Sequence, residues 1–110
     1  MKSHKNLIAQ RQRLLARLPP LSEMVRGSFF VRWRRCGKPG CRCKSTRGHR
    51  TAYVAVTFKD GSTEQIALPR ELEPVARRWV RNYQRWWKSV EDISRINREL
   101  LRRRLVEPSE

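Results

Sequence analysis

Residues 36–49 read CGKPGCRCKSTRGH. It holds every cysteine of the 110-residue chain, Cys36, Cys41 and Cys43, and one of its two histidines, His49. Three thiolates and one imidazole form a complete tetrahedral ligand set for zinc. The spacing C-x4-C-x-C-x5-H differs from the paired C-x2-C of zinc ribbons and from the C2H2 finger, so the prediction rests on the ligand types and on their closeness in the chain.

We predict that Cys36, Cys41, Cys43 and His49 bind a structural Zn2+ ion. A catalytic zinc is not expected, because no Asp or Glu lies nearby in the sequence to act as a general base. Two alternatives stand beside this prediction: His4 or a partner's side chain as the fourth ligand, or three free thiols without a metal. Free cysteines favour apolar interiors, however, and these three lie among Lys, Arg and Gly.

Strand patterns flank the metal-binding stretch on both sides. Residues 28–35, 51–58 and 62–68 alternate with the period of two that is typical of strands, and Ile66 is expected to point towards the core. Asp60-Gly61 is a strong hairpin signal between the last two strands. The sequence therefore predicts three antiparallel strands, with the metal-binding residues inserted between the first two.

Helical patterns lie at both ends of the chain. Residues 5–18 have apolar positions at helical spacing, and Pro19-Pro20 ends that helix. A second, longer helix is expected from about Val75 to about Arg104. The predicted fold is α+β, with an N-terminal helix, a three-stranded antiparallel sheet with a zinc-knuckle insertion between its first two strands, and a long C-terminal helix. Residues 1–23 would form the N-terminal helix and connector, residues 24–106 one compact domain, and residues 107–110 a frayed tail.

An interaction seam with heptad spacing runs along the expected C-terminal helix and favours packing against another helix. Its members are Trp79, Tyr83, Trp86, Val90, Ile93, Asn97 and Leu100. Asn97 is polar at a seam position, so it would either fix the register of a coiled coil or lie exposed. A homodimer through this seam is therefore one expectation.

The charge of the chain points to a polyanionic partner. Twenty-six Lys and Arg face ten Asp and Glu, which leaves a formal net charge of +16. Self-repulsion of this size weakens the compact state, so the fold does not explain it. No apolar run approaches the ~20 residues of a membrane span, and no continuous apolar stretch of a signal peptide is present. We expect a cytoplasmic protein without a membrane partner, able to associate with the nucleoid.

The basic residues concentrate around the metal-binding stretch and on the long helix. From residue 24 to residue 59 there are ten Lys or Arg and no Asp or Glu. One-sided charge of this kind favours phosphate contacts over decoration by salt bridges. The predicted nucleic-acid-binding residues are Arg32, Arg34, Arg35, Lys38, Arg42, Lys44, Arg47, Arg50, Arg77, Arg81, Arg85 and Lys88.

Phe30 shares a strand face with Arg32 and Arg34, and two interpretations are open for it. Its ring could stack on an unpaired base. Alternatively, the ring could pack beneath the N-terminal helix.

The motif CGKPGCRC resembles that of a family of small bacterial proteins of unknown function, which carry a CGKPxCxC knuckle and a following histidine. The matching pieces are Gly27-Ser28, Cys36 to Cys43, His49, Tyr53-Val54 and Val75 to Tyr83. The family is often associated with mobile elements and transposases, so the resemblance implies a DNA-related accessory role. This chain has His49-Arg50-Thr51 where the family usually has His-Gly-Pro, and the turn after the histidine is expected to differ.

The sequence favours a binding protein over an enzyme, because no catalytic set of Ser, His, Cys or paired carboxylates emerges. The first hypothesis is a zinc-stabilised nucleic-acid-binding accessory protein, with DNA favoured and a link to a mobile element or to a recombination or defence system. The second is an adaptor or dimerisation subunit that docks a recombinase or transposase through the seam. The third is an RNA-binding component of a ribonucleoprotein.

Overall fold

The computed structural model describes residues 3–107, and its element order confirms the predicted fold class. The first helix, α1, spans His4–Ala16, and the long helix, α2, spans Glu73–Arg102. Between them lie the strands β1 (Ser28–Arg34), β2 (His49–Thr57) and β3 (Thr63–Leu68). Three short 3-10 turns join these elements: η1 (Leu21–Glu23), η2 (Arg42–Ser45) and η3 (Arg70–Leu72). The predicted tail lies outside the described residues beyond Glu107.

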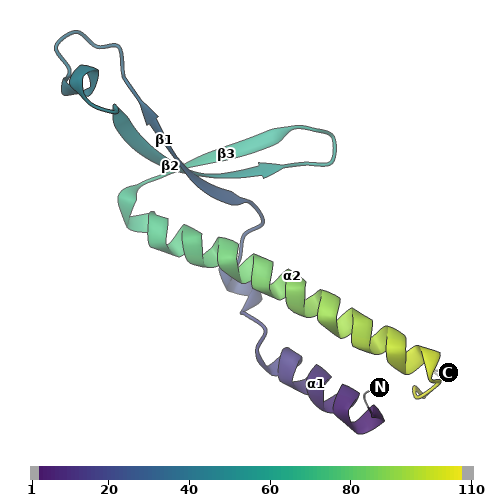
Figure 1. Cartoon of the computed structure of the whole chain (residues 1–110). Helices are drawn as coiled ribbons and strands as arrows, with labels where there is room; N and C mark the ends of the chain where they lie inside the picture. Colours follow the sequence, from purple (N-terminus) through teal and green to yellow (C-terminus); the bar gives the residue numbers. More distant parts are fainter. Residues whose placement is uncertain (1–2, 108–110) are drawn as a thin grey trace.

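The sheet is antiparallel in the order β1-β2-β3, and α2 lies against one of its faces (Figure 1). Strand β1 pairs with residues 49–55 of β2, from Ser28 opposite Ala55 to Arg34 opposite His49. Strand β3 pairs only with residues 52–57 of β2. The part of the sheet nearest the metal-binding stretch is therefore a two-stranded ribbon, which projects away from α2 (Figure 1).

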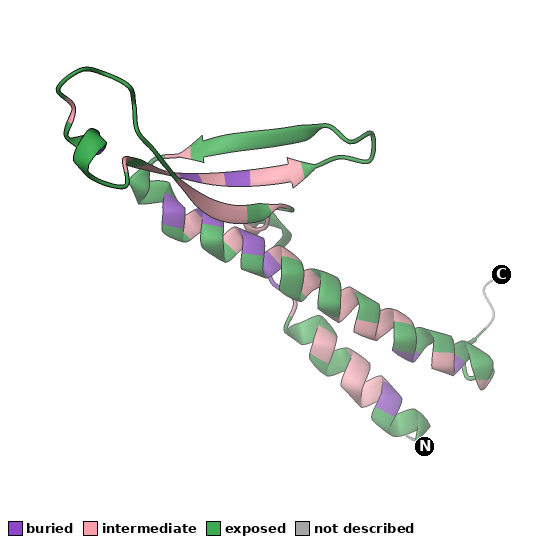
Figure 2. Ribbon diagram, turned by 45° about the horizontal axis from the view of Figure 1, so that its top comes forward, coloured by how far each residue is buried: buried purple, intermediate pink, exposed green. Residues whose placement is uncertain are grey.

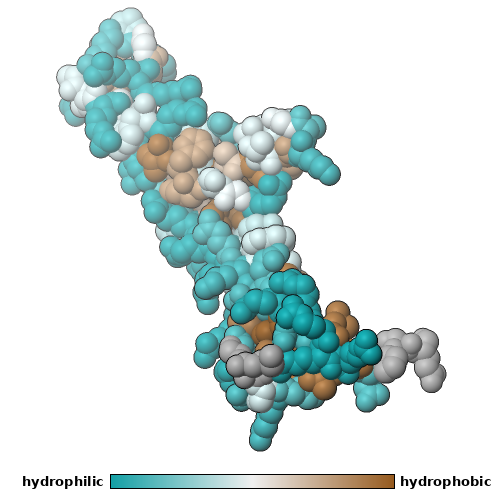
Figure 3. Space-filling model, turned by 45° about the vertical axis from the view of Figure 1, so that its right-hand side comes forward, coloured by the Kyte–Doolittle hydropathy of each residue, from teal (hydrophilic) through white to brown (hydrophobic). Residues whose placement is uncertain are grey.

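The molecule is elongated, and its core is divided into two small clusters. Its extents are 72 × 29 × 26 Å, and its radius of gyration is 21.8 Å, whereas a compact chain of this length would have about 13 Å. Figures 2 and 3 show buried residues and apolar surface gathered near the sheet and near the end that holds both termini.

The two clusters lie on different parts of α2. Near the sheet, Ala76 and Val80 of α2 pack against Val54 of β2, with Phe29 at the margin. At the far end, Ile96 and Leu100 of α2 pack against Leu7 of α1. A single long helix therefore connects two separately packed ends.

This arrangement bears on two expectations about side chains. Ile66 lies opposite Val54 and points towards α2 as expected, but it stays 46% exposed because β3 is an edge strand that α2 does not fully cover. Phe30 does not pack beneath α1, because α1 lies along the far half of α2, away from the sheet (Figure 1). The Phe30 ring instead stacks on Tyr53, its partner on β2.

Candidate metal centre

The loop between β1 and β2 brings the four predicted ligands together. Strand β1 ends at Arg34, the chain turns through η2, and β2 begins at His49. Gly37 and Gly40 have φ of 71° and 75°, and they allow the chain to turn here because glycine adopts positive φ without steric cost. The ribbon holds the two ends of the loop side by side, since Arg34 and His49 are directly paired.

The ligand atoms form a tight cluster that could hold a metal ion. One ligand atom from each of Cys36, Cys41, Cys43 and His49 lies within 4.8 Å of the others. The Sγ atoms of Cys36 and Cys43 are 3.4 Å apart, and Cys41 Sγ is 3.4 Å from His49 Nε2. Two sulfurs lie ~3.8 Å apart in a tetrahedron with metal–sulfur bonds of ~2.3 Å, so the cluster has the dimensions of a tetrahedral site.

The surroundings of the thiols differ in ways that matter for metal binding. A backbone hydrogen bond at Lys38, and then the thiols of Cys43 and Cys41, lower the pKa of Cys36. The Cys36 amide donates to Cys43 Sγ at 3.2 Å and lowers the pKa of Cys43, but burial and the neighbouring thiols outweigh it, so the net pKa of Cys43 is raised. Cys43 is only 3% exposed, whereas Cys36 is exposed. The thiolate therefore forms more easily at Cys36 than at Cys43.

Polar contacts around the ligands hold the loop in shape. The Thr46 hydroxyl donates to the Cys43 carbonyl at 3.4 Å and accepts from the Gly48 amide at 3.1 Å. Arg35 Nε donates to the Thr46 carbonyl at 3.1 Å. These bonds tie the 3-10 turn that carries Cys43 to the start of β2, so they position the ligands relative to one another.

Gly48 is a requirement of this site that the sequence patterns did not single out. Its φ is 101°, and a Cβ atom there would lie 2.4 Å from both the carbonyl carbon and the carbonyl oxygen of Arg34. Only glycine allows the two strands to approach so closely immediately before His49. In the sequence, the only signal of this requirement is the position of Gly48 immediately before the last candidate ligand, His49.

The predicted nucleic-acid-binding residues of the loop lie on its surface. Arg34, Lys38, Arg42 and Lys44 are exposed and have no side-chain partner among the described residues. Arg47 is also exposed, and its guanidinium lies 4.5 Å from the ring centroid of Trp33. The four candidate ligands thus lie within an exposed basic loop at the tip of the ribbon.

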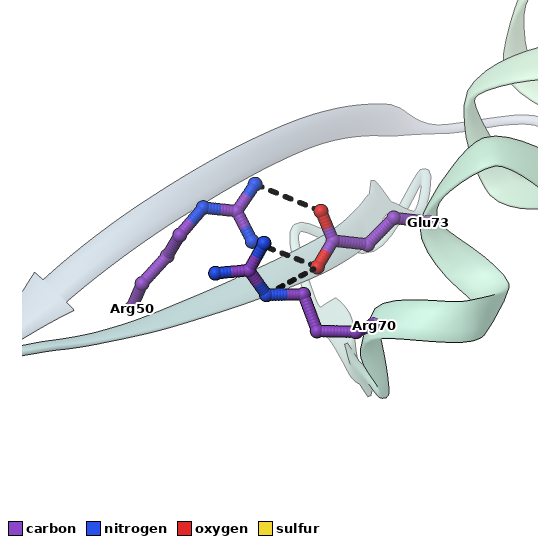
Figure 4. A network of polar contacts seen from close by, with 3 residues as sticks. All are labelled: Arg50, Arg70 and Glu73. Carbon is purple, nitrogen blue, oxygen red and sulfur yellow. Dashed lines mark hydrogen bonds and ion pairs between the residues drawn. The ribbon is translucent and has the colours of Figure 1, made fainter.

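Arg50, another predicted phosphate contact, has a carboxylate partner within the chain. Its two terminal nitrogens donate to the two carboxylate oxygens of Glu73, each at 2.8 Å, and Arg70 approaches the same carboxylate at 4.0 Å (Figure 4). Glu73 is the first residue of α2 and is only 8% exposed. Hydrogen bonds from Arg50 lower the pKa of Glu73, so the pair is charged at neutral pH. No local pattern predicts this pairing, because 23 residues separate the partners.

The basic residues of α2 form a stripe that begins beside the sheet. Arg77 lies with its guanidinium 4.3 Å from the ring centroid of Phe29 on β1. Arg81, Arg85 and Lys88 follow, exposed and without a carboxylate partner among the described residues. The stripe therefore begins where α2 packs against the start of β1.

The predicted seam is used partly within the chain. Leu100 is buried against Leu7 of α1, and the Asn97 side-chain oxygen accepts a hydrogen bond of 2.7 Å from Arg11 of α1. Other members lie half-buried along α2: Trp79, Tyr83, Trp86, Val90 and Ile93. The far end of the seam is thus covered by α1, which leaves less of it for a second chain.

A family model described as a domain of unknown function, DUF6788, matches residues 4–78, which is more than half of the chain and includes the whole metal centre. No curated protein and no solved structure matches the chain significantly. Neither helix within residues 3–107 combines the length and apolar character needed to cross a membrane.

Proposed function

The chain belongs to the DUF6788 family, and we propose that it is a nucleic-acid-binding accessory protein whose basic loop is held in shape by structural zinc. DNA is the favoured polymer. The resemblance to proteins associated with mobile elements supports a role beside a recombinase or transposase, in the cytoplasm and near the nucleoid.

The ligand set supports zinc as the metal. Three thiolates and one imidazole are a closed tetrahedral set, typical of structural rather than catalytic zinc. A softer ligand set of this kind disfavours Mg2+ and Ca2+, which prefer oxygen ligands. Native mass spectrometry before and after treatment with a chelator tests this assignment. We expect one zinc per chain; a protein purified under reducing conditions without metal would contradict it.

The observation that carries the proposal is the basic two-stranded ribbon. Beyond the end of β3, only β1 and β2 continue, and they lead to a loop with exposed Arg and Lys and no carboxylate. The major groove of B-form DNA admits a two-stranded ribbon, whereas the major groove of an A-form RNA helix is too deep and narrow for side chains to enter. The shape of the basic surface therefore favours DNA over double-stranded RNA.

Salt dependence of binding tests the proposal directly. If about six phosphates are neutralised, log K should fall with log salt at a slope near −5 for a DNA duplex. The measurement is fluorescence anisotropy with a labelled duplex at several salt concentrations, with an RNA duplex of the same sequence beside it. Affinity that does not change with salt would contradict the proposal.

A charge-reversed variant shows which surface makes the contacts. Replacing Arg81, Arg85 and Lys88 by Glu should weaken binding to DNA, because their phosphate contacts are lost. It should leave the packing intact, because these exposed side chains have no carboxylate partner in the described part of the chain. A matched control replaces Lys5, Arg13 and Arg17, exposed residues at the other end, by Glu. It changes the net charge equally, so equal loss of binding in both variants would show that net charge alone attracts DNA.

A second candidate function is an adaptor or a homodimer. A groove of about 230 Å3 between β3 and α2 is lined only by apolar side chains, among them Ile66 and Leu72, which are 46% and 47% exposed. Apolar surface of this kind favours a protein partner. Sedimentation of the wild type and of Ile66→Gln tests the homodimer: a dimer that the substitution dissociates would support this candidate, and a monomer would exclude self-association through the groove.

A further inference from the structure

The face of the sheet opposite α2 is open. Residues on β1 and β2 alternate between the two faces, and those directed towards α2 include the buried Ala52 and Val54. Phe30 and Tyr53 lie on the opposite face, as directly paired residues. No helix of the described chain lies over that face (Figures 1 and 2).

Two stacked aromatic rings and an arginine occupy the middle of this open face. The ring centroids of Phe30 and Tyr53 are 5.2 Å apart, with an angle of 17° between the ring planes. The Arg32 guanidinium lies 5.4 Å from the centroid of Phe30 and 5.3 Å from that of Tyr53, within the range of cation–π contacts. All three side chains are half-exposed, so parts of the rings and of the guanidinium remain accessible.

The positive charge of the open face favours an anionic ligand. By strand alternation the face holds Arg32 and Arg34, whereas Glu64, the nearest carboxylate of the sheet, belongs to the face towards α2. Arg34 lies two residues beyond Arg32 in the direction of the basic loop. An aromatic platform with a line of cations beside it matches a polymer that has flat bases and a phosphate backbone.

We propose that the Phe30–Tyr53–Arg32 platform binds unpaired bases of a nucleic-acid strand by stacking. The inference rests on the proposed nucleic-acid binding and adds single-stranded DNA as the class of ligand at this face. The ribbon and loop contact phosphates, and the platform holds one or two bases that have left the duplex. Such a protein prefers DNA with a duplex joined to an unpaired segment.

The ring pair would also be expected if its only role were to stabilise the sheet, because cross-strand aromatic pairs do so. A change in the nucleic acid distinguishes base stacking from stabilisation of the sheet better than a substitution in the protein does. Removing bases from the DNA while keeping its phosphates leaves the protein untouched and takes away only the stacking partner.

The test measures the affinity of the zinc-loaded protein for three labelled probes by fluorescence anisotropy. They are oligothymidylate of about 12 nucleotides, within the site size of a single-strand-binding domain, the same strand with abasic sites throughout, and a duplex of equal length. Stacking predicts that the abasic strand binds about 5- to 150-fold more weakly than oligothymidylate, since each stacked base contributes about that factor. Equal affinity for the two strands, with a normal salt dependence, would overturn the platform and leave the proposed function standing. Absence of binding to all three probes would overturn both.

A pair of substitutions locates the effect on the protein. Tyr53→Val keeps a residue with high strand propensity but removes the ring, and it should reduce the difference between oligothymidylate and the abasic strand. Phe58→Leu is the matched control, because Phe58 is also exposed and also has an arginine, Arg26, 5.6 Å from its ring centroid, but it lies at the hairpin end. A difference that disappears in the Phe58 variant and persists in the Tyr53 variant would overturn the assignment to this face.

Discussion

At one end of the molecule α1 packs on α2 through Leu7, Ile96 and Leu100, whereas at the other end the loop between β1 and β2 buries only Cys43. The helical end has the apolar contacts that stabilise most small domains. The loop has arginines, lysines and glycines instead, and these repel one another or contribute little to a core. The two ends thus draw on different sources of stability, and a metal ion would supply it at the loop alone.

A bound zinc ion with its ligands would also add negative charge to the basic loop. Three thiolates and a neutral imidazole around Zn2+ carry a net charge of about −1, in the midst of side chains that are all positive. The metal centre would therefore attract the surrounding arginines towards itself while their guanidinium groups stay at the surface. A hydrophobic core of equal size would supply no such attraction.

The sharpest way to separate the two ends is Cys43→Ser. Cys43 is the buried ligand, and its loss should weaken zinc binding more than a hundredfold, beyond the 10- to 100-fold typical of changes around the ligands. Native mass spectrometry would report the metal, and hydrogen exchange would report faster exchange in residues 35–48 with α1 and α2 unchanged. Ser45→Ala, in the same 3-10 turn, is the control and should keep the zinc. Unfolding of the helical end together with the loop would refute the independence of the two ends.

The complementary change is Leu100→Ala at the helical end. Leu100 is only 1% exposed, so the cavity should lower the free energy of unfolding by about 2–5 kcal/mol, measured by denaturant titration. Leu101→Ala, at a neighbouring position that is 63% exposed, should change it by less than about 0.5 kcal/mol. Zinc affinity should stay at the wild-type value in both variants. Weaker zinc binding in the Leu100 variant would mean that the ends are coupled through α2.

A smaller effect is expected from a substitution at Gly48, where β1 and β2 approach each other closely beside the candidate metal ligands. Gly48→Ala places a Cβ against the Arg34 carbonyl and should cost more than the ~1–3 kcal/mol of a strained backbone conformation alone. Gly40→Ala is the control, because Gly40 also has positive φ but nothing within 4 Å of the added atom. Zinc competition assays should show weaker binding for the Gly48 variant than for the Gly40 variant. Equal affinities would indicate that the loop adapts without moving His49.

The sequence predicted those features of the fold that depend on local patterns. Alternation in residues 28–35 and 51–58, the Asp60-Gly61 turn and the spacing of apolar residues in α2 each identify an element within a few neighbouring positions. The closeness of the four ligands could be predicted for the same reason, because they lie within one loop. The number and type of these ligands can be read from the sequence of the loop alone.

Features that depend on packing between distant elements could not be predicted. The seam spacing of α2 fits many partners, and only the structure shows that α1 takes its far end through Leu7 and Arg11. Phe30 offers the same apolar ring to either of two neighbours, so its place on an open face depends on where α1 lies. Arg50 resembles every other arginine of the basic segment until the position of Glu73 is known.

The Arg50–Glu73 pair connects the loop end of the molecule to α2, because Arg50 follows the candidate ligand His49 and Glu73 begins α2. Hydrogen bonds from Arg50 place the pKa of Glu73 below its usual value when the protein is folded. The pair therefore stabilises the fold fully above the unfolded pKa of about 4.3, and this contribution is lost as the pH falls through the lower folded pKa. Glu73→Gln should melt at a lower temperature than the wild type at neutral pH, and the gap should narrow below about pH 4.3. Circular dichroism of the helices during heating measures the melting temperatures at neutral and at acidic pH. Any release of metal in acid occurs in both proteins, so it cancels in the difference between them. Glu71→Gln, an exposed neighbour without a partner in the described chain, should show no such gap at either pH. A gap of equal size at neutral and acidic pH would mean that Glu73 acts through its packing, and that the metal-bound end is not joined to α2 by this charge pair.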